Sequence, residues 1–341
     1  MMFKKIRDER QENFDIYEKK LIDFNFDGKN KKVYSNCNLS IFVDDYCNAD
    51  CKFCVAQLRY EDMNMQYKKE RIKDDEEYFK RLDELLTILE PLNLSVSITG
   101  GEPTKSPRLP RILELIDKHN IRKRTITSNG SGLLDVVDGK RIIDHLIDNH
   151  FDHLNISKVH YNEEINKKIM CYKKGYCSNE DLKYIIPYAL KNNLRPRLSC
   201  LLLKSGIHNL DDMSKYIEFY EKLGIDNIIF RQLMDYNHDT MCNISKMNFC
   251  ETNNVDLNDI WAVVDKDSRF VPLKQVLGYY YYVEIYKYNN VVVCSESADL
   301  KILNKEKEKN KDVVYEMVIH PNGNLNGSWV DSEDILIKYK K

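Results

Sequence analysis

Short apolar segments that alternate with helical segments constrain the fold of this chain more than any other feature. Each apolar segment is long enough for one strand, and a segment with helical periodicity usually follows it. This alternation is typical of βαβ units around a parallel sheet, so six units predict an α/β protein with a partial (βα)6 TIM-like barrel. The predicted strands are 39–43, 94–99, 124–128, 153–157, 197–203 and 227–232, and the predicted helices are 76–89, 109–118, 140–149, 180–192 and 211–223.

The segments on either side of the barrel have a different character. Residues 1–36 are strongly charged with a rough helical stripe, which predicts an N-terminal helical extension before a barrel over 37–237. Residues 238–341 are expected to form a small α+β region that covers the substrate. Within it we predict a connecting loop at 241–257, a short helix at 257–264, a hairpin of 278–288 with 291–293, a solvated loop at 305–311, and 313–320 leading into a last short strand.

Composition excludes some classes of protein. The chain has 341 residues, of which 43% are hydrophobic and 31% charged, and its net charge is −2. A dedicated nucleic-acid binder would usually be basic. There is no apolar run long enough for a transmembrane helix, and the charged N-terminus does not resemble a signal peptide. Ten cysteines without an export signal predict thiols in a reducing, cytoplasmic compartment.

Three cysteines lie close together just after the first predicted strand. Cys47, Cys51 and Cys54 form a C-x3-C-x2-C run. Thiolates are soft ligands that select iron–sulfur clusters, copper(I) or zinc. A structural zinc site usually closes with four ligands, and the chain has no second C-x2-C pair to supply them. Three thiolates on one short loop therefore favour a four-iron cluster with one iron open to a ligand.

Two further motifs follow the next two predicted strands. Gly100-Gly101-Glu102-Pro103 comes after strand 94–99, and paired glycines allow a backbone to approach a ligand closely. Thr127-Ser128-Asn129-Gly130 stands at the end of strand 124–128. Chemistry in such barrels is located at the C-terminal ends of the strands. We therefore expect the cysteine loop and both motifs to lie at the same end of the barrel.

The cysteine run, the GGEP motif and the TSNG motif, in this order, resemble the radical S-adenosylmethionine (SAM) superfamily. The resemblance extends from about Leu39 to Met234. It implies an enzyme with a [4Fe–4S] cluster on Cys47, Cys51 and Cys54 and with SAM on the open iron. It also implies that SAM is cleaved reductively, that a 5′-deoxyadenosyl radical takes hydrogen from a substrate, and that flavodoxin or ferredoxin supplies the electron.

The same resemblance suggests which residues contact SAM. Gly100, Gly101 and Glu102 are expected at the methionine amine, and Phe53 near the adenine. Other candidates stand at strand ends, where they could equally be polar groups satisfied within the protein. Side chains alternate along a strand, so only one of Arg231 and Gln232 should face the barrel, and we expect it to be Gln232. His160 and Tyr161, just beyond strand 153–157, could contact the substrate. These further candidates for SAM are Ser128, Asn129, Ser157, Arg197 and Gln232.

Within the superfamily the chain looks most like the molybdenum-cofactor cyclase and SPASM/twitch branch. The matching residues include Asn155-Ile156-Ser157 and the run from Phe230 to Met234. That cyclase has a glutamate at the position of Gln232, a C-terminal cluster motif and a glycine-rich tail, and this chain has none of them. A peptide and a nucleotide or small metabolite both remain open as substrates. A non-catalytic iron–sulfur redox sensor is a minor alternative.

Overall fold

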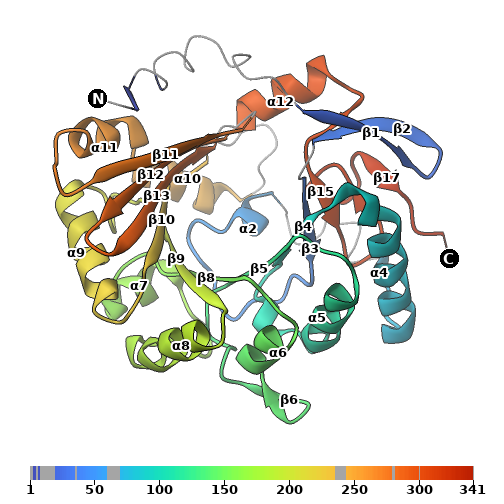
Figure 1. Ribbon diagram of the computed structural model, residues 1–341, viewed down its shortest axis with the longest axis horizontal. Helices are drawn as coiled ribbons and strands as arrows, with labels where there is room; N and C mark the ends of the chain where they lie inside the picture. Colours follow the sequence, from blue (N-terminus) through green and yellow to red (C-terminus); the bar gives the residue numbers. More distant parts are fainter. Residues whose placement is uncertain are drawn as a thin grey trace.

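One sheet of twelve strands dominates the structure. The computed structural model describes residues 3–4, 7, 20–34, 37–59, 70–234, 243–278, 281–298 and 300–340. The strand order is β11-β12-β13-β10-β9-β8-β5-β4-β3-β15-β16-β17. The sheet curves around a central space without closing on itself, as Figure 1 shows. This is the partial TIM-like barrel of the α/β class that the sequence predicts.

The six central strands are parallel and confirm all six predicted strands. Neighbours in the order pair in parallel from β3 through to β10, as βαβ connections require. Their C-terminal ends therefore meet at one end of the barrel. The bounds are β3 Asn38–Phe42, β4 Ser95–Thr99, β5 Lys123–Ser128, β8 His153–Ser157, β9 Arg195–Leu201 and β10 Asn227–Arg231.

Helices cover the outer face of these strands and confirm the five predicted helices. Asp74, Ser178 and Asn209 begin three of them, because each side chain accepts a hydrogen bond from a backbone N–H of the first turn. Apolar side chains on their inner faces are fully buried against the sheet. These helices are α4 Asp75–Leu89, α5 Leu109–Lys118, α6 Ile142–Asp148, α8 Asn179–Lys191 and α9 Leu210–Glu221; α7 Glu163–Met170 follows β8.

The C-terminal part of the chain extends the same sheet at both edges. On one side β13 pairs in parallel with β10, and on the other β15 pairs in parallel with β3. The predicted hairpin is confirmed as β12 and β13, and the helix at 257–264 as α11. The bounds are β11 Val271–Leu277, β12 Tyr281–Tyr288, β13 Val291–Ala298, α11 Leu257–Val264, β14 Val313–Val314, β15 Met317–Ile319, β16 Leu325–Asn326 and β17 Ile335–Ile337.

The helical prediction for the end of the N-terminal extension is wrong. Residues Leu21–Phe26 (β1) and Lys29–Tyr34 (β2) form an antiparallel hairpin. Asp27 and Gly28 both have positive φ at its turn, and Asp-Gly is a strong hairpin signal that outweighs the weak helical stripe. Residues 8–19, where the rest of the predicted helix would lie, are outside the described residues.

Two predicted loops are helices. The segment predicted as a loop at 241–257 contains α10 (Ile244–Asn253), which begins where Asn243 accepts from the backbone N–H of Lys246. The segment predicted as a solvated loop at 305–311 lies mostly in α12 (Leu300–Lys309), whose Leu300 and Leu303 are buried. Its Lys and Glu residues favour a helix in their own right, and two buried leucines at i, i+3 are enough to hold it to the protein.

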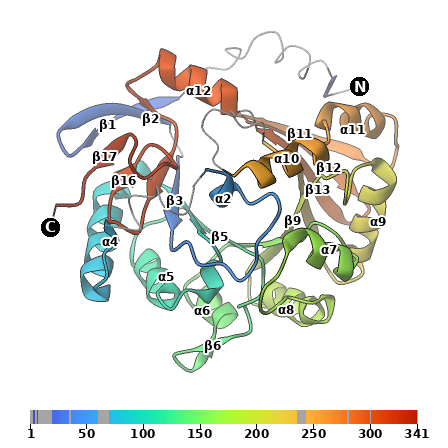
Figure 2. The ribbon, with the colours of Figure 1, turned by 180° about the vertical axis from the view of Figure 1, so that it is seen from behind.

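Two short helices lie over the barrel. Figure 2 shows α2 (Val55–Arg59) beside α10 across the middle of the molecule. Leu58 of α2 and Cys250 of α10 belong to one buried apolar cluster. Among the described residues, no helix combines the length and the apolar character that crossing a membrane requires.

Candidate active site

The three cysteines lie on the loop that leaves the C-terminal end of β3. The backbone N–H of Cys54 donates to the carbonyl oxygen of Cys51 (3.1 Å), and α2 starts directly after Cys54. All three are free thiols and none is fully exposed. Burial raises the pKa of Cys51, and the thiols of Cys54 and Cys47 raise it further. The loop therefore brings the three sulfur groups into one electrostatic neighbourhood.

The diglycine lies directly against the backbone that precedes Cys47. The N–H of Gly101 donates to the carbonyl oxygen of Asp44, and the N–H of Glu102 donates to that of Tyr46, both at 2.7 Å. A Cβ on Gly101 would lie 2.1 Å from the carbonyl oxygen of Tyr46. The glycines are thus required for close contact between two segments of the protein. From the sequence, the same close approach was expected towards a ligand.

The carboxylate of Glu102 joins the GGEP motif to the TSNG motif. Oε1 accepts from the hydroxyl of Ser128 (2.6 Å) and from the backbone N–H and hydroxyl of Thr104 (3.0 and 2.5 Å). Oε2 accepts from the backbone N–H of Asn129 (2.7 Å). Glu102 is buried, which raises its pKa, while these four donors oppose the rise. The side chain predicted at the methionine amine is thus engaged within the protein, and its contact with SAM stays a prediction.

Asn48 connects the cysteine loop to two other parts of the site. Its Oδ1 accepts from Nδ2 of Asn129 (2.9 Å), and its own Nδ2 donates to the carbonyl oxygen of Lys174 (2.6 Å). The backbone N–H of Asp50 donates to the carbonyl oxygen of Cys171 (3.0 Å). The cysteine loop is therefore held between the end of β5 and the segment after α7. In the sequence Asn48 matches the radical SAM pattern beside Cys47, but the sequence assigned it no role in the site.

Residues from α10 and from the segment after α7 close over the loop. Nζ of Lys246 donates to the carbonyl oxygen of Cys51 (2.6 Å) and to Oδ1 of Asp50 (2.9 Å). Phe53 and Tyr172 pack in the same apolar cluster as Cys51. This environment fits the prediction that Phe53 lies beside the cofactor but does not test it. Nothing in the local sequence marks Lys246, because its partner is distant along the chain.

The donor set suits an iron–sulfur cluster. Three thiols stand on one partly buried loop, and the carbonyl groups around them are occupied by protein donors. In the part of the chain that the structure describes, no three or more His, Cys, Asp or Glu side chains are gathered in a ready metal-binding arrangement. The assignment of Cys47, Cys51 and Cys54 as ligands therefore stays a prediction.

The remaining candidates divide between the inside and the outside of the barrel. Ser157 pairs with Ser199 at the C-terminal end of β8, and Nε of Arg197 donates to Oδ1 of Asn155 (2.9 Å). Arg231 pairs with Glu296 and lies on the same strand face as Ile229, inside the barrel. Phe230 faces the helices, where it contacts Tyr216.

The expectation that Gln232, and not Arg231, faces the barrel is wrong. Oε1 of Gln232 accepts from the backbone N–H of Leu257, the first residue of α11, at 3.4 Å. Strand alternation places Gln232 on the face of Phe230. Tyr161 likewise packs on Phe219 of α9, and the ring of His160 contacts that of Tyr161 at a tilt of 37°, so both side chains are engaged on the side of α9.

The barrel of this chain matches a known family of proteins. A family model described as the radical SAM superfamily matches residues 41–228. A curated protein, GTP 3′,8-cyclase 1 of Mycobacterium tuberculosis, is 31% identical over 108 residues, which cover 30% of this chain and 28% of the relative. The match thus spans little more than a quarter of that relative's length.

Solved structures with similar folds include a histidine-tagged form of anSMEcpe with bound AdoMet. It is 14% identical, covers 87% of this chain and 75% of that chain, and has a TM-score of 0.48. HydG, a maturase of the [FeFe]-hydrogenase, is 16% identical, with coverage of 67% and 48% and a TM-score of 0.44.

Proposed function

This chain belongs to the radical SAM superfamily, whose family model matches more than half of it, and we propose that it uses SAM to abstract hydrogen from an organic substrate. As a member of this superfamily it is an enzyme whose cofactors are SAM and a [4Fe–4S] cluster. We assign the cluster to Cys47, Cys51 and Cys54. The electron donor we propose is a small protein such as flavodoxin or ferredoxin, in a reducing compartment such as the cytoplasm.

One observation carries the proposal: the cysteine loop, the diglycine and the TSNG motif converge at the ends of β3, β4 and β5. Glu102 accepts hydrogen bonds from the TSNG motif, and its backbone N–H donates to the residue before Cys47. A site whose parts come from three strands must be rigid to hold a cofactor in register. Buried hydrogen bonds between the three segments supply that rigidity.

The cofactors carry the difficult chemistry, and the chain positions them. When bound, the reduced cluster and SAM supply a 5′-deoxyadenosyl radical that can take hydrogen from an unactivated carbon. Asn48 and Lys246 hold the cysteine loop in place through their hydrogen bonds to Asn129 and to the carbonyl oxygen of Cys51. Tyr172 and Phe53 add apolar cover beside Cys51, which keeps water and oxygen away from the loop.

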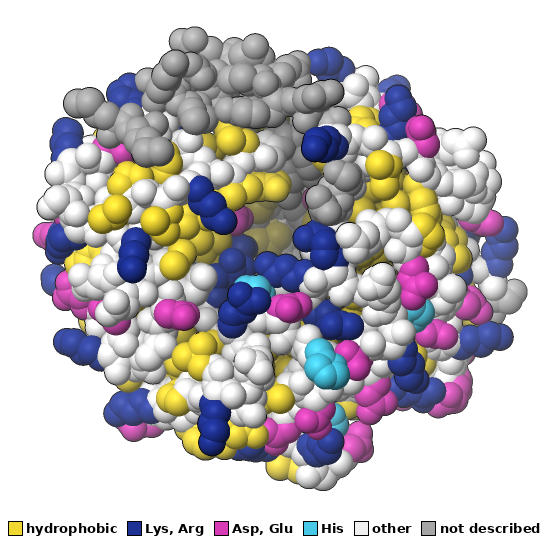
Figure 3. Space-filling view, viewed as in Figure 1, with side chains coloured by type: hydrophobic (Ala, Val, Ile, Leu, Met, Phe, Trp, Pro, Cys, Tyr) yellow, Lys and Arg dark blue, Asp and Glu magenta, His cyan; other side chains and the backbone are white. Residues whose placement is uncertain are grey.

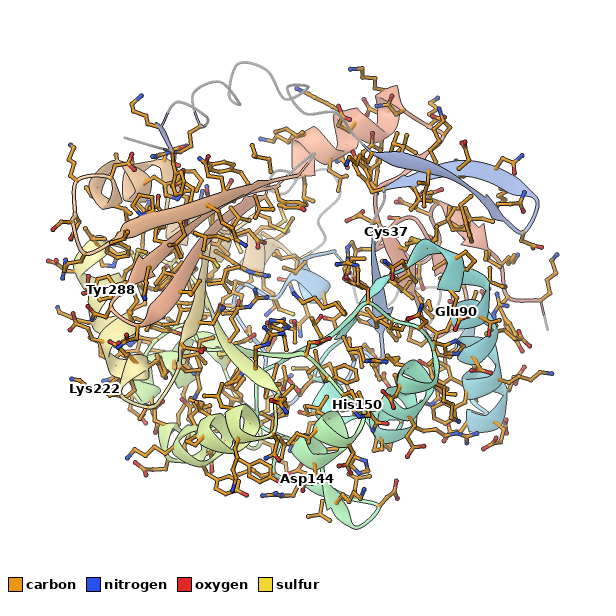
Figure 4. All side chains as sticks on the ribbon, in the orientation of Figure 1. Cys37, Glu90, Asp144, His150, Lys222 and Tyr288 are labelled. Atoms are coloured by element: carbon orange, nitrogen blue, oxygen red, sulfur yellow. The ribbon has the colours of Figure 1, made fainter. Side chains whose placement is uncertain are left out.

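The decisive experiment compares Cys51→Ala with Cys37→Ala. Cys37 directly precedes β3, at the opposite end of that strand from the cysteine loop (Figure 4). After anaerobic reconstitution with iron and sulfide, we expect the wild type and Cys37→Ala to be brown. With dithionite and SAM, both should release 5′-deoxyadenosine. We expect Cys51→Ala to lose iron and turnover and to remain folded by circular dichroism.

Three outcomes would contradict the proposal. Iron and turnover retained in Cys51→Ala would remove the cysteine loop from the cluster site. A wild type that binds iron but releases no 5′-deoxyadenosine would indicate a redox sensor. A colourless wild type that retains zinc would indicate a structural zinc module.

A further inference from the structure

The inner face of the barrel carries a row of cationic side chains that the proposed SAM site does not use. We call Lys123, His153, Arg195, Arg197 and Arg231 the cationic wall; they come from β5, β8, β9 and β10. His153 pairs with Arg195 in the register of β8 and β9. The residues that alternate with the cationic ones along these strands, such as Leu154 and Leu198, are fully buried under the helices. Alternation therefore directs the cationic wall inward.

The positive charges of the cationic wall act on one another, and the wall has few counter-charges. Burial lowers the pKa of Arg197, and the charge of Arg231 lowers it further. Burial lowers the pKa of His153 to about 4, with added effects of Lys123, Arg195 and Arg197. Among the described residues, the carboxylates that act on Lys123, His153 and Arg197 are Asp152 and Glu296. Four permanent cations thus face two carboxylates.

The hydrogen-bonding capacity of the wall is only partly used. Arg231 approaches Glu296 at 3.6 Å, which is too long for a hydrogen bond. In the part of the chain that the structure describes, Nε of Arg231 and Nδ1 of His153 are buried and have no hydrogen-bond partner. Buried polar groups without partners are uncommon and call for an explanation. A bound anion near Arg231 would offset the positive charge there and accept from its Nε.

An apolar wall faces the same space. Ile229, Val283 and Cys294 form a small buried cluster of their own, with Tyr281, Ile285 and Val292 packed against it. These residues come from β10, β12 and β13, and Ile229 shares a strand face with Arg231. In the space-filling view of Figure 3, Lys and Arg side chains border a central hollow whose wall includes hydrophobic side chains.

We propose that the barrel interior binds the oxyanion of an organic substrate, a phosphate or a carboxylate, with the anion on Arg197 and Arg231 and the carbon skeleton on the apolar wall. Guanidinium groups suit this task because they bind both oxyanions in a bidentate manner. The inference rests on the proposed function and adds the chemical class of the substrate. It differs from the sequence expectation for Arg197, which paired it with the carboxylate of SAM.

The test measures anion binding and not turnover. Cluster-loaded protein, saturated with SAM, is titrated in a calorimeter with butyl phosphate, butyrate and butanol. We expect at least one anion to bind about ten-fold or more tightly than butanol, and the tighter anion identifies phosphate or carboxylate. We expect the Arg197→Gln/Arg231→Gln double variant to lose at least about ten-fold in that affinity, because it removes the charge-assisted hydrogen bonds that the two guanidinium groups donate to the anion.

Two single variants make the result independent of folding in the double variant. Glu296→Gln removes the carboxylate that competes for Arg231, so anion affinity should rise several-fold. Arg111→Gln removes an exposed cation on α5 that pairs with Glu76, and it should change nothing. An unchanged affinity in Glu296→Gln, or an effect of Arg111→Gln as large as that of the double variant, would overturn the proposal.

Two further outcomes would also reject it. Butanol that binds as tightly as the anions would leave only an apolar pocket. Anion binding that is seen without SAM and is lost when SAM is added would indicate that Arg197 binds the carboxylate of SAM. Release of 5′-deoxyadenosine, measured on the same samples, separates a failure of this proposal from a failure of the proposed function.

Discussion

Gly101→Ala tests whether the diglycine serves the cysteine loop. A Cβ on Gly101 would meet the carbonyl oxygen of Tyr46 at 2.1 Å, its carbonyl carbon at 2.5 Å, and the carbonyl oxygen of Asp45 at 2.6 Å. Real Cβ contacts essentially never fall below 3.0 Å. The backbone at residues 45–46 must therefore move by about 1 Å, and it cannot rotate aside as a side chain would. Cys47 is the next residue and moves with it.

The expected cost follows from the contacts that this shift breaks. Overpacking in a tight site costs about 1–3 kcal/mol. The two backbone hydrogen bonds from Gly101 and Glu102 to this segment contribute about 1 kcal/mol each. We therefore expect Gly101→Ala to lower the free energy of unfolding by about 3–5 kcal/mol, or to relieve the clash by displacing the cysteine loop.

The assay combines stability with iron loading. Gly206→Ala is a matched control, because its new Cβ would approach no atom closer than 3.4 Å. Urea unfolding of the apo protein and iron content after anaerobic reconstitution are measured for both variants. We expect Gly206→Ala to behave as the wild type and Gly101→Ala to lose stability, iron or both. If Gly101→Ala matched its control in both measurements, the contact between the diglycine and the cysteine loop would not exist.

Three further predictions concern buried polar groups. Glu102→Gln places an amide N–H against a donor, either Thr104 or Asn129, and should destabilise the apo protein by about 1–3 kcal/mol in urea; a loss of SAM affinity without this loss of stability would instead favour direct contact with the methionine amine. Asn48→Ala removes the links to Asn129 and Lys174 and should reduce iron retention during gel filtration; retention equal to the wild type would contradict its role. Burial lowers the pKa of His320 from 6.5 to about 4, so the folded state prefers the neutral ring. Its contribution is complete above pH 6.5 and is lost as the pH falls towards 4, which costs about 3 kcal/mol. We expect His320→Gln to lack this part of the pH dependence in urea titrations at pH 7 and pH 4.5, and equal pH dependence in both proteins would refute it.

Local patterns were sufficient for the barrel and insufficient for its additions. The strands at 94–99 and 153–157 alternate apolar and polar residues between helical segments, and this period of two is the local signal of a strand with one face buried against helices. The hairpin at 21–34 was mistaken for a helix because charged residues obscured its alternation, although Asp27-Gly28 marks its turn. The helices α10 and α12 bury few side chains, so their periodicity is weak.

For the site, sequence order placed the three motifs but not the contacts among them. The spacing of Cys47, Cys51 and Cys54 and the positions of the GGEP and TSNG motifs after strands already predicted one end of a barrel. That Glu102 would be used within the protein could not be inferred, because its donors lie on a different strand. Gln232 was preferred to Arg231 by resemblance, and the packing of Phe230 against α9 reversed that preference.

The sequence by itself determined the strands, the order of the motifs and the end of the barrel at which they meet, because alternation and βαβ succession are local properties of a chain. Tertiary structure decided which donors surround Glu102, which backbone the diglycine touches, and which charges share the barrel interior. These depend on strands that are distant in sequence and adjacent in space. Register between neighbouring strands sets such contacts, and no single segment encodes it.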